Sequence, residues 1–395
     1  MLPFVRMLEY GNIKPAPPGI KKIATSNLHC AFLYTNGSMY LRGGGGSYKM
    51  GIGNQDNIMN QFLKVPFDVV DCWLGLFCTI ILTSDLKMYI AGNKSYIGIS
   101  GAATVWTEIT SSFSTINVST IKDIQLTSTY EGDGSCLILM QDGSLYGLGS
   151  NGYSVIGVPD VWITQPILMD TNVSKIDVQD NRAAGFYIKE GVLYRCGYGI
   201  NNVLGTPGTN LTTYTALNIP DTVIDVMSTF KCTKILTRDV SGNLALYIAG
   251  DNSDVQFGTG QASTVKNTTF TKYNTIPNID LNRSFSFLPA NGALNAVRNN
   301  GTVYTTGASN SNGYGLGRPI STNIADRLSY FPIQFEDNID YTESDVQFNV
   351  QGSSGLSYIK LSSNIVYWAG NRGYYTEQSS GSGNQDKFVK MILPE

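Results

Sequence analysis

The chain has 395 residues, of which 42% are hydrophobic and only 14% are charged, and its formal net charge is −3. An average soluble domain is about 25% charged, so this chain is poor in charge, and its high apolar content excludes a disordered chain. The balance of 27 basic and 30 acidic residues predicts no nucleic-acid partner, and no apolar run is long enough for a membrane-spanning helix, so we expect no membrane contact.

The first predicted elements, in residues 19–68, show the unit from which the chain is built. An apolar strand over 31–34 leads into Asn36-Gly37, a dipeptide that supplies the positive φ angles of a two-residue hairpin turn. The next strand contains Tyr40 and ends at a glycine, and a polar loop then leads to an outer strand. The 42 glycines and 23 tyrosines of the chain favour such strands and turns over helices.

The same unit recurs through the whole chain, marked by a tyrosine with a glycine three residues later. Successive tyrosines of this motif are 48 to 63 residues apart. We interpret the motif residues as structural residues that define the repeat. They are Tyr40 and Gly43, Tyr89 and Gly92, Tyr146 and Gly149, Tyr194 and Gly197, Tyr247 and Gly250, Tyr304 and Gly307, and Tyr367 and Gly370. A second glycine follows each tyrosine by eleven residues in five units: Gly51, Gly157, Gly205, Gly258 and Gly315.

Seven units of about four antiparallel strands predict an all-β protein, a seven-bladed β-propeller of four-stranded blades. The predicted blades, in chain order, are residues 19–68, 69–119, 120–170, 171–221, 222–279, 280–339 and 340–395, together one domain over 19–395. Residues 1–18 form an N-terminal segment. Its residues Phe4–Leu8 are similar in sequence to Phe388–Leu393. We expect one of these segments to complete the last blade and the other to cap it or pair elsewhere, and the sequence leaves open which.

The chain contains no recognisable catalytic, cofactor-binding or metal-binding motif. Its single histidine, His29, excludes most metal sites and triads, and we interpret it as a structural hydrogen-bonding residue. The glycines of the G-x-G-x-x-G match at 147–152 are explained by the repeat. The carboxylate pairs Asp68 with Asp71 and Asp177 with Asp180 are interpreted as solvated turns. We expect all six cysteines to be reduced and buried, and no cofactor or metal.

The units resemble the RCC1-type repeat (regulator of chromosome condensation). His29, Leu33 and Asn36-Gly37 match the family pattern in the first unit, and Leu204-Gly205 and Leu316-Gly317 match its late Leu-Gly. The resemblance covers nearly all of residues 19–395 and implies an RCC1-like propeller. Such propellers serve as guanine-nucleotide exchange factors, light sensors, inhibitors and binding platforms. The basic tail of the chromatin-binding member and the Trp-rich centre of the photoreceptors are absent, so those two activities are not implied.

The leading hypothesis is a non-catalytic structural or protein-interaction propeller. Low charge, abundant Asn, Thr and Gly, and free cysteines resemble bacteriophage virion proteins. We therefore expect a collar, whisker, tail or capsid-decoration protein that binds neighbouring virion proteins and is assembled in the host cytoplasm; outside a virion it would be cytoplasmic. The alternatives are a regulatory module, either exchange factor-like or an inhibitor, and a glycan-binding propeller. Three loop tyrosines are candidate interface residues: Tyr314, Tyr374 and Tyr375.

Overall fold

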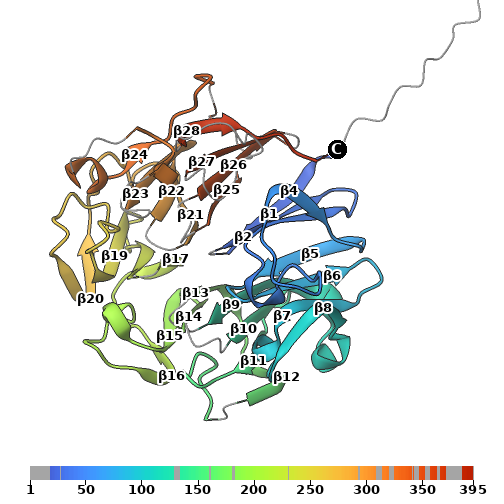
Figure 1. The fold of residues 1–395 in the computed structure, drawn as a ribbon. Helices are drawn as coiled ribbons and strands as arrows, with labels where there is room; N and C mark the ends of the chain where they lie inside the picture. The colour runs from blue at the N-terminus through green and yellow to red at the C-terminus, as the bar shows by residue number, and fades with distance from the viewer. Residues whose placement is uncertain are drawn as a thin grey trace, which may run out of the picture.

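A computed structural model of the chain shows seven four-stranded antiparallel sheets arranged as a ring (Figure 1). The structure describes residues 18–26, 28–128, 134–159, 162–179, 183–229, 231–291, 294–307, 314–319, 324–339, 341, 347–351, 356–362, 365–370 and 385–394. The architecture is the predicted all-β, seven-bladed propeller. In each blade the strands pair in sequence order, from an inner strand at the ring's centre to an outer strand at its rim.

The first four blades occupy the amino-terminal half of the chain. Blade 1 consists of β1 (Ile20–Thr25), β2 (His29–Tyr34), β3 (Met39–Gly43) and β4 (Ile58–Lys64). Blade 2 consists of β5 (Val69–Leu74), β6 (Cys78–Thr83), β7 (Met88–Asn93) and β8 (Ala102–Glu108). Blade 3 consists of β9 (Ile121–Ser128), β10 (Gly134–Met140), β11 (Leu145–Ser150) and β12 (Trp162–Asp170). Blade 4 consists of β13 (Val173–Gln179), β14 (Ala184–Lys189), β15 (Val192–Gly197) and β16 (Leu211–Ala216).

The last three blades complete the ring. Blade 5 consists of β17 (Thr222–Ser228), β18 (Cys232–Arg238), β19 (Leu244–Asp251) and β20 (Lys266–Tyr273). Blade 6 consists of β21 (Phe285–Asn291), β22 (Leu294–Asn299), β23 (Thr302–Gly307) and β24 (Phe331–Pro332). Blade 7 consists of β25 (Gln347–Gln351), β26 (Leu356–Ser362), β27 (Ile365–Gly370) and β28 (Gln385–Lys390). Short 3-10 helices lie in the connections: η1 (Gly46–Tyr48), η2 (Lys94–Ile97), η3 (Thr110–Phe113), η4 (Val118–Thr120), η5 (Ile200–Asn202), η7 (Tyr314–Leu316) and η8 (Ile324–Arg327).

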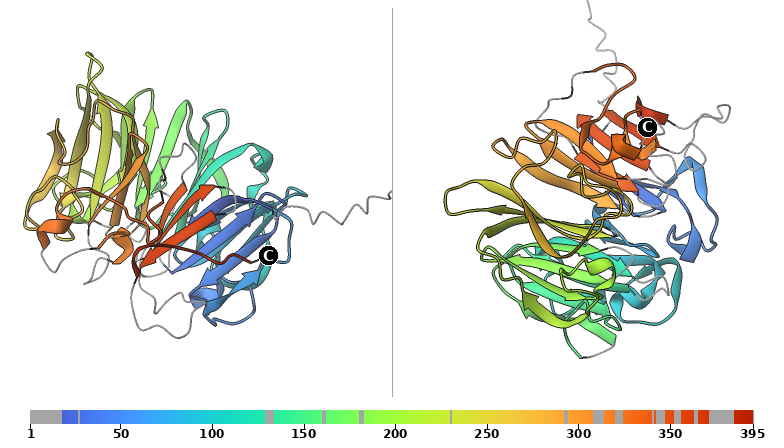
Figure 2. Two further views of the ribbon diagram at one scale, coloured as in Figure 1. Left: turned by 90° about the horizontal axis from the view of Figure 1, so that it is seen from above. Right: turned by 90° about the vertical axis from the view of Figure 1, so that its left-hand side faces the viewer.

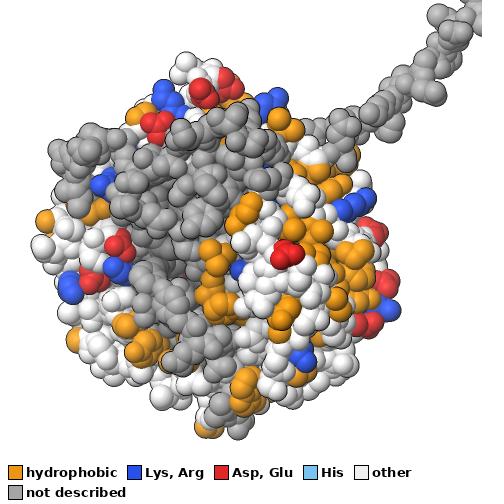
Figure 3. All heavy atoms as spheres, viewed as in Figure 1, with side chains coloured by type: hydrophobic (Ala, Val, Ile, Leu, Met, Phe, Trp, Pro, Cys, Tyr) orange, Lys and Arg blue, Asp and Glu red, His pale blue; other side chains and the backbone are white. Residues whose placement is uncertain are grey.

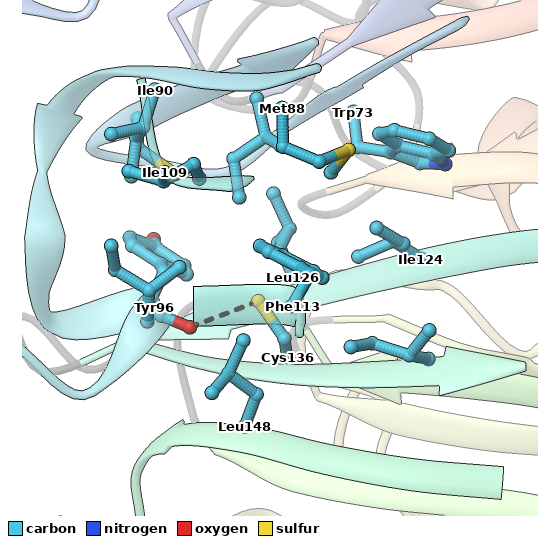
Figure 4. Close-up of a cluster of buried hydrophobic side chains, with 14 of the residues drawn as sticks. Trp73, Met88, Ile90, Tyr96, Ile109, Phe113, Ile124, Leu126, Cys136 and Leu148 are labelled. Atoms are coloured by element: carbon cyan, nitrogen blue, oxygen red, sulfur yellow. Dashed lines mark hydrogen bonds between the residues drawn. The ribbon is translucent and has the colours of Figure 1, made fainter. Parts of the chain in front are cut away.

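The hydrophobic core is divided among the seven interfaces between neighbouring blades. Each interface within the described residues holds one cluster of buried apolar side chains, because each sheet has two apolar faces and each face packs on a neighbour. Figure 4 shows the cluster between blades 2 and 3, where the Cys136 thiol in β10 donates a hydrogen bond to the Tyr96 carbonyl in η2, 3.0 Å away. Blades therefore pack through both apolar contacts and polar contacts between loop and strand.

The ring closes by packing between blades 7 and 1. The C-terminal strand β28 is the outer strand of blade 7, and β1 and β2 of blade 1 share a hydrophobic cluster with β26 and β27. The Tyr34 hydroxyl donates to the Pro394 carbonyl at 3.0 Å, which places this end of the chain on blade 1, as the left-hand view in Figure 2 also shows. The predicted capping or closing role of residues 1–18 falls almost entirely outside the described residues, which begin at 18.

Candidate functional site: the central channel and the contacts between blades

The inner strands of all seven blades line a cavity of about 530 Å³ at the centre of the ring. Its walls carry both charged and apolar side chains, because alternate residues of each inner strand border the cavity. The lysines and aspartates of the lining come from blades 1, 3 and 4, and blades 5 and 6 contribute Met227 and Phe287. On the face shown in Figure 3, hydrophobic side chains gather over blades 1 and 2, and charged side chains are scattered around the periphery. The cavity thus has a mixed lining, in which charged and apolar residues alternate on the same inner strands.

Side chains of one inner strand bind the inner strand of the following blade. Lys22 of blade 1 donates to the Asp71 carboxylate at 2.7 Å and to the Cys72 carbonyl at 2.9 Å in blade 2. Lys175 of blade 4 forms the same kind of ion pair with Asp225 of blade 5. In both pairs the lysine belongs to the earlier blade and the aspartate to the next blade along the chain.

A second set of such contacts lies further along the same strands. The Thr127 hydroxyl donates to the Gln179 carbonyl at 2.6 Å, and the Gln179 side-chain amide donates to the Thr229 carbonyl at 2.8 Å. These three residues come from blades 3, 4 and 5 and are buried. The Gln347 amide of blade 7 reaches the Lys21 carbonyl of blade 1 at 3.3 Å. The same direction of donation therefore also crosses the closure of the ring.

Two aspartates of the predicted turn pairs lie in these inner strands instead. Asp71 is in β5 and Asp177 is in β13, so their interpretation as solvated turn residues is wrong. Asp177 accepts a hydrogen bond from the Ser228 backbone N–H at 2.6 Å. Burial in the channel raises the pKa of Asp177 to about 8, against the opposing effect of Lys175. Sequence reasoning missed the channel carboxylates, although their alternation with buried Ile and Val residues was a usable signal.

The seven motif glycines occupy one backbone position that only glycine fits. All seven have positive φ, between 101° and 138°. Each pairs with the start of the second strand of its blade, and in six blades the pairing with the outer strand shifts register there, which marks a bulge. A Cβ at Gly92 would lie 2.2 Å from the Phe77 carbonyl oxygen. The glycine is therefore required for both the bulge and the close approach of the two backbones.

The motif tyrosines lie in the third strand of each blade and contact the connections between blades. The Tyr247 hydroxyl donates to Asp221 at 3.0 Å, and the Tyr367 hydroxyl donates to Asp337 at 3.2 Å. Tyr89 stacks on Phe67, with ring centroids 4.4 Å apart. In the remaining blades, Tyr40, Tyr146, Tyr194 and Tyr304 pack at the edges of the interblade clusters.

The second glycine of the repeat contacts the following blade. Gly51 lies against Trp106 in the outer strand β8, and Gly258 lies against Tyr330 beside β24, so that a Cβ at either position would meet an aromatic ring. In blade 6 this position is held by Gly317, which packs on Phe388, and not by Gly315, the glycine at the predicted spacing. Gly317 follows Tyr304 by two residues more than the equivalent glycine follows its tyrosine in blades 1, 3, 4 and 5, and for this reason the fixed spacing pointed to the wrong glycine.

His29 and the cysteines are buried structural residues. The His29 ring nitrogens lie 2.5 Å from the Ser26 hydroxyl and 2.8 Å from the Thr79 hydroxyl, and burial lowers the His29 pKa well below its ordinary value. All six cysteines are free and buried, as predicted. Among the described residues, no group of three or more His, Cys, Asp or Glu side chains could hold a metal ion, and no helix is long and apolar enough to cross a bilayer.

The predicted interface tyrosines fall mostly beyond the described part of the chain. Tyr374 and Tyr375 lie outside it, and Tyr314 is the first residue of η7. The structure draws attention to another surface instead. The outer strands β8 and β12 of neighbouring blades expose Val105, Trp162 and Leu168, whose exposed fractions are 52%, 45% and 57%. These residues were not singled out from the sequence, because outward and inward positions of an outer strand cannot be distinguished without its register.

Seven four-stranded blades around a central channel define the chain as a seven-bladed β-propeller. It is similar to a chain of the crystal structure of Kap60 bound to yeast RCC1 (Prp20), with a TM-score of 0.64 and 17% sequence identity over 89% of this chain and 80% of that chain. It is also similar to human WBSCR16, with a TM-score of 0.61 and 14% identity over 86% of this chain and 87% of that one. The propeller is RCC1-like in fold. No family model and no curated protein matches the chain.

Proposed function

We propose that the protein is a non-catalytic platform that binds other proteins through the rim of its propeller. The observation that carries this proposal is the exposure of Trp162 and Leu168 on the outer strand β12. Aromatic side chains are enriched in protein interfaces. The rigid ring supports the same role, because it holds β12 in a fixed position.

The setting we propose is a bacteriophage particle, in which the propeller is a collar, whisker, tail or capsid-decoration protein bound to neighbouring structural proteins. The low charge of 14% and the 42 glycines support this setting. The protein would be assembled in the host cytoplasm and carried in the virion. Mass spectrometry of purified particles tests this proposal: detection at a stable copy number per particle supports it, and absence from intact particles overturns it.

Substitution of the exposed rim tests the binding role itself. We expect Trp162→Ser with Leu168→Ser to weaken partner capture at least tenfold while leaving the melting temperature unchanged, since both side chains are exposed. Val240→Ser is the matched control, because Val240 is fully exposed on the hairpin of blade 5, away from this rim. Unchanged capture by the double variant would contradict the assignment of this surface.

A second candidate is a regulatory protein-binding module. The fold similarity to Prp20 favours it, because a crystal structure of Prp20p from Saccharomyces cerevisiae is described together with its binding to Gsp1p and histones (TM-score 0.62, 16% identity). Nucleotide-release assays with small GTPases separate this candidate from the platform: stimulation of release supports it, and a uniformly negative result excludes an exchange activity.

A further inference from the structure

A groove of about 520 Å³ lies between the β18–β19 hairpin of blade 5 and the entry to blade 6, the neighbouring blades whose inner strands are β17 and β21 (Figure 1). Its apolar lining includes Ile224 and Leu244 of blade 5 and Phe285 of blade 6. Leu244 and Phe285 are half-buried and Ile224 is 37% exposed. The groove therefore holds apolar surface in contact with water, which an apolar group of a ligand would cover.

One wall of the groove is the last part of the connection between the two blades, residues 280–284. A buried amide, that of Asn299, holds this wall in place. Its Oδ1 accepts from the Asp280 backbone N–H at 3.0 Å, and its Nδ2 donates to the carbonyls of Asp280 at 2.9 Å and Ser284 at 3.1 Å. Because the wall is ordered before a ligand arrives, binding does not have to order it.

The two carboxylates nearest to the groove are bound within their own turns. In the hairpin, Asp239 accepts from the backbone N–H groups of Ser241 and Asn243, both at 2.9 Å, and from the Asn243 side chain at 3.0 Å. In the opposite wall, Asp280 accepts from the Asn282 backbone at 3.0 Å and side chain at 3.2 Å. No acidic side chain is among the described residues that line the groove itself.

Two arginines line the groove, Arg238 of β18 and Arg283 of the opposite wall, and both are exposed. Within the described ranges, the Arg238 guanidinium has no hydrogen bond or ion pair to protein. Arg283 donates through Nε to Asp280 at 3.1 Å, which leaves its two terminal nitrogens for another acceptor. Guanidinium groups match the two oxygens of a carboxylate, so the charged part of the lining suits a carboxylate ligand.

Three uncharged oxygens in the lining are acceptors for a different group. Asn243, Asn282 and Ser284 line the groove and are exposed. In the described structure, neither amide oxygen nor the Ser284 hydroxyl accepts a hydrogen bond from protein, because the two asparagines use their amide nitrogens in the turns. These oxygens can accept hydrogen bonds from the N–H groups of a peptide. A simple fatty acid has no such donor.

We propose that this groove binds the C-terminus of a partner protein whose last residue is apolar. Arg238 and Arg283 bind the terminal carboxylate, and the last side chain covers Ile224, Leu244 and Phe285. The N–H groups of the preceding residues donate to the oxygens of the lining. The inference rests on the proposed role as a protein-binding platform and adds a second contact to it, on blades 5 and 6 and apart from the rim strand β12.

Calorimetric titration of the full chain with the peptide acetyl-Gly-Gly-Leu tests the two halves of this site. We expect the C-terminal amide of the same peptide to bind about tenfold more weakly, because it lacks the charge that the arginines bind. Acetyl-Gly-Gly-Gly, which lacks the apolar side chain, should also bind about tenfold more weakly. Equal affinity for acid and amide would overturn the carboxylate contact, and no binding of the acid at about 5 mM would overturn the site.

Substitution of the arginines locates the site on the chain. Arg238→Gln and Arg283→Gln each remove a charge from an exposed position, so we expect an unchanged melting temperature and a dissociation constant raised about fivefold or more. Lys266→Gln is the matched control. It removes an exposed positive charge from blade 5 at the end of the sheet away from the hairpin, and should leave affinity unchanged. Wild-type affinity in both arginine variants would overturn the assignment.

Two further measurements separate this site from its alternatives. Hexanoate has a carboxylate and a hydrocarbon chain but no N–H group, and we expect it to bind at least about fivefold more weakly than acetyl-Gly-Gly-Leu. Equal affinity for the two would overturn the peptide ligand and indicate a small apolar acid. The double variant Trp162→Ser with Leu168→Ser should bind the peptide as the wild type does, so failure of the groove and failure of the rim are distinguishable.

Discussion

The Nζ of Lys234 in blade 5 lies 2.7 Å from the hydroxyl oxygen of Tyr330 in blade 6, and both side chains are fully buried. Lys234 also donates to the Gln256 carbonyl at 2.5 Å. Tyr330 in turn packs on the glycine Gly258 of blade 5. A lysine, a tyrosine and a glycine thus join blades 5 and 6.

The buried lysine makes stability depend on pH. Burial lowers the pKa of Lys234 from 10.5 to about 8, so between these values the unfolded chain binds more protons than the folded chain. The free energy of unfolding therefore rises with pH in this window, by at most about 1.4 kcal/mol per pH unit from this group. Urea denaturation between pH 8 and 9.5 should show a steeper rise for the wild type than for Lys234→Met. Parallel curves would contradict this prediction.

Substitution of a motif glycine should be strongly destabilising. In Gly92→Ala the new Cβ meets the Phe77 carbonyl at 2.2 Å, and φ is +101°, so we expect a loss of about 3 kcal/mol in the free energy of unfolding. Gly46→Ala is the control, because a Cβ there meets nothing within 4 Å. Chemical denaturation measures both variants. A loss at Gly92 no larger than that at Gly46 would show that the bulge tolerates a side chain.

The polar contacts between inner strands should each contribute modestly. Thr127→Val removes the hydroxyl that donates to the Gln179 carbonyl and keeps the side-chain shape, so we expect a loss of about 1 kcal/mol. Thr107→Val is matched to it, since the Thr107 hydroxyl donates to a carbonyl at an exposed site, and its effect should stay below about 0.5 kcal/mol. Urea denaturation measures both losses of unfolding free energy. A loss for Thr127→Val no larger than that for Thr107→Val would contradict the prediction.

The thiols should be unreactive in the folded protein. All six cysteines are buried, and burial raises the pKa of Cys30 to about 11 and that of Cys72 and Cys196 to about 12. Because the thiolate is the reactive form, we expect Ellman's reagent at pH 8 to modify the thiols of the native chain only as fast as the chain unfolds. In denaturant, the reagent should modify all six thiols at once. Rapid modification of a native thiol would contradict the burial of that residue.

Much of the fold could be predicted from the sequence because the bulge glycine imposes the same residue type in every blade. Gly43 and its six equivalents have positive φ, and Asn36-Gly37 marks a hairpin, so backbone requirements are directly visible as residue types. The number and order of strands followed from these positions. The outer strands were harder to place, because the loops before them differ in length, as Gly317 shows.

The channel could not be predicted in the same way. Asp71 and Asp177 are polar residues within short apolar stretches, and a polar residue there is compatible with either a turn or an inner strand. The pairing of Asp71 with Leu82 of β6 and its ion pair with Lys22, 49 residues earlier, place it on the inner strand β5. Contacts between residues this far apart depend on how blades pack, which local patterns do not encode.

Every blade is one uninterrupted stretch of chain, from inner strand to outer strand, and this includes blade 7, which ends with the C-terminal strand β28. No sheet would be divided if the chain were opened between any two blades and its present ends were joined. Circular permutants cut at such connections should therefore assemble all seven sheets. It follows that duplication, loss or exchange of a gene segment of about 50 codons adds, removes or replaces one whole blade. The sequence of the propeller can therefore diversify while every remaining sheet keeps its four strands.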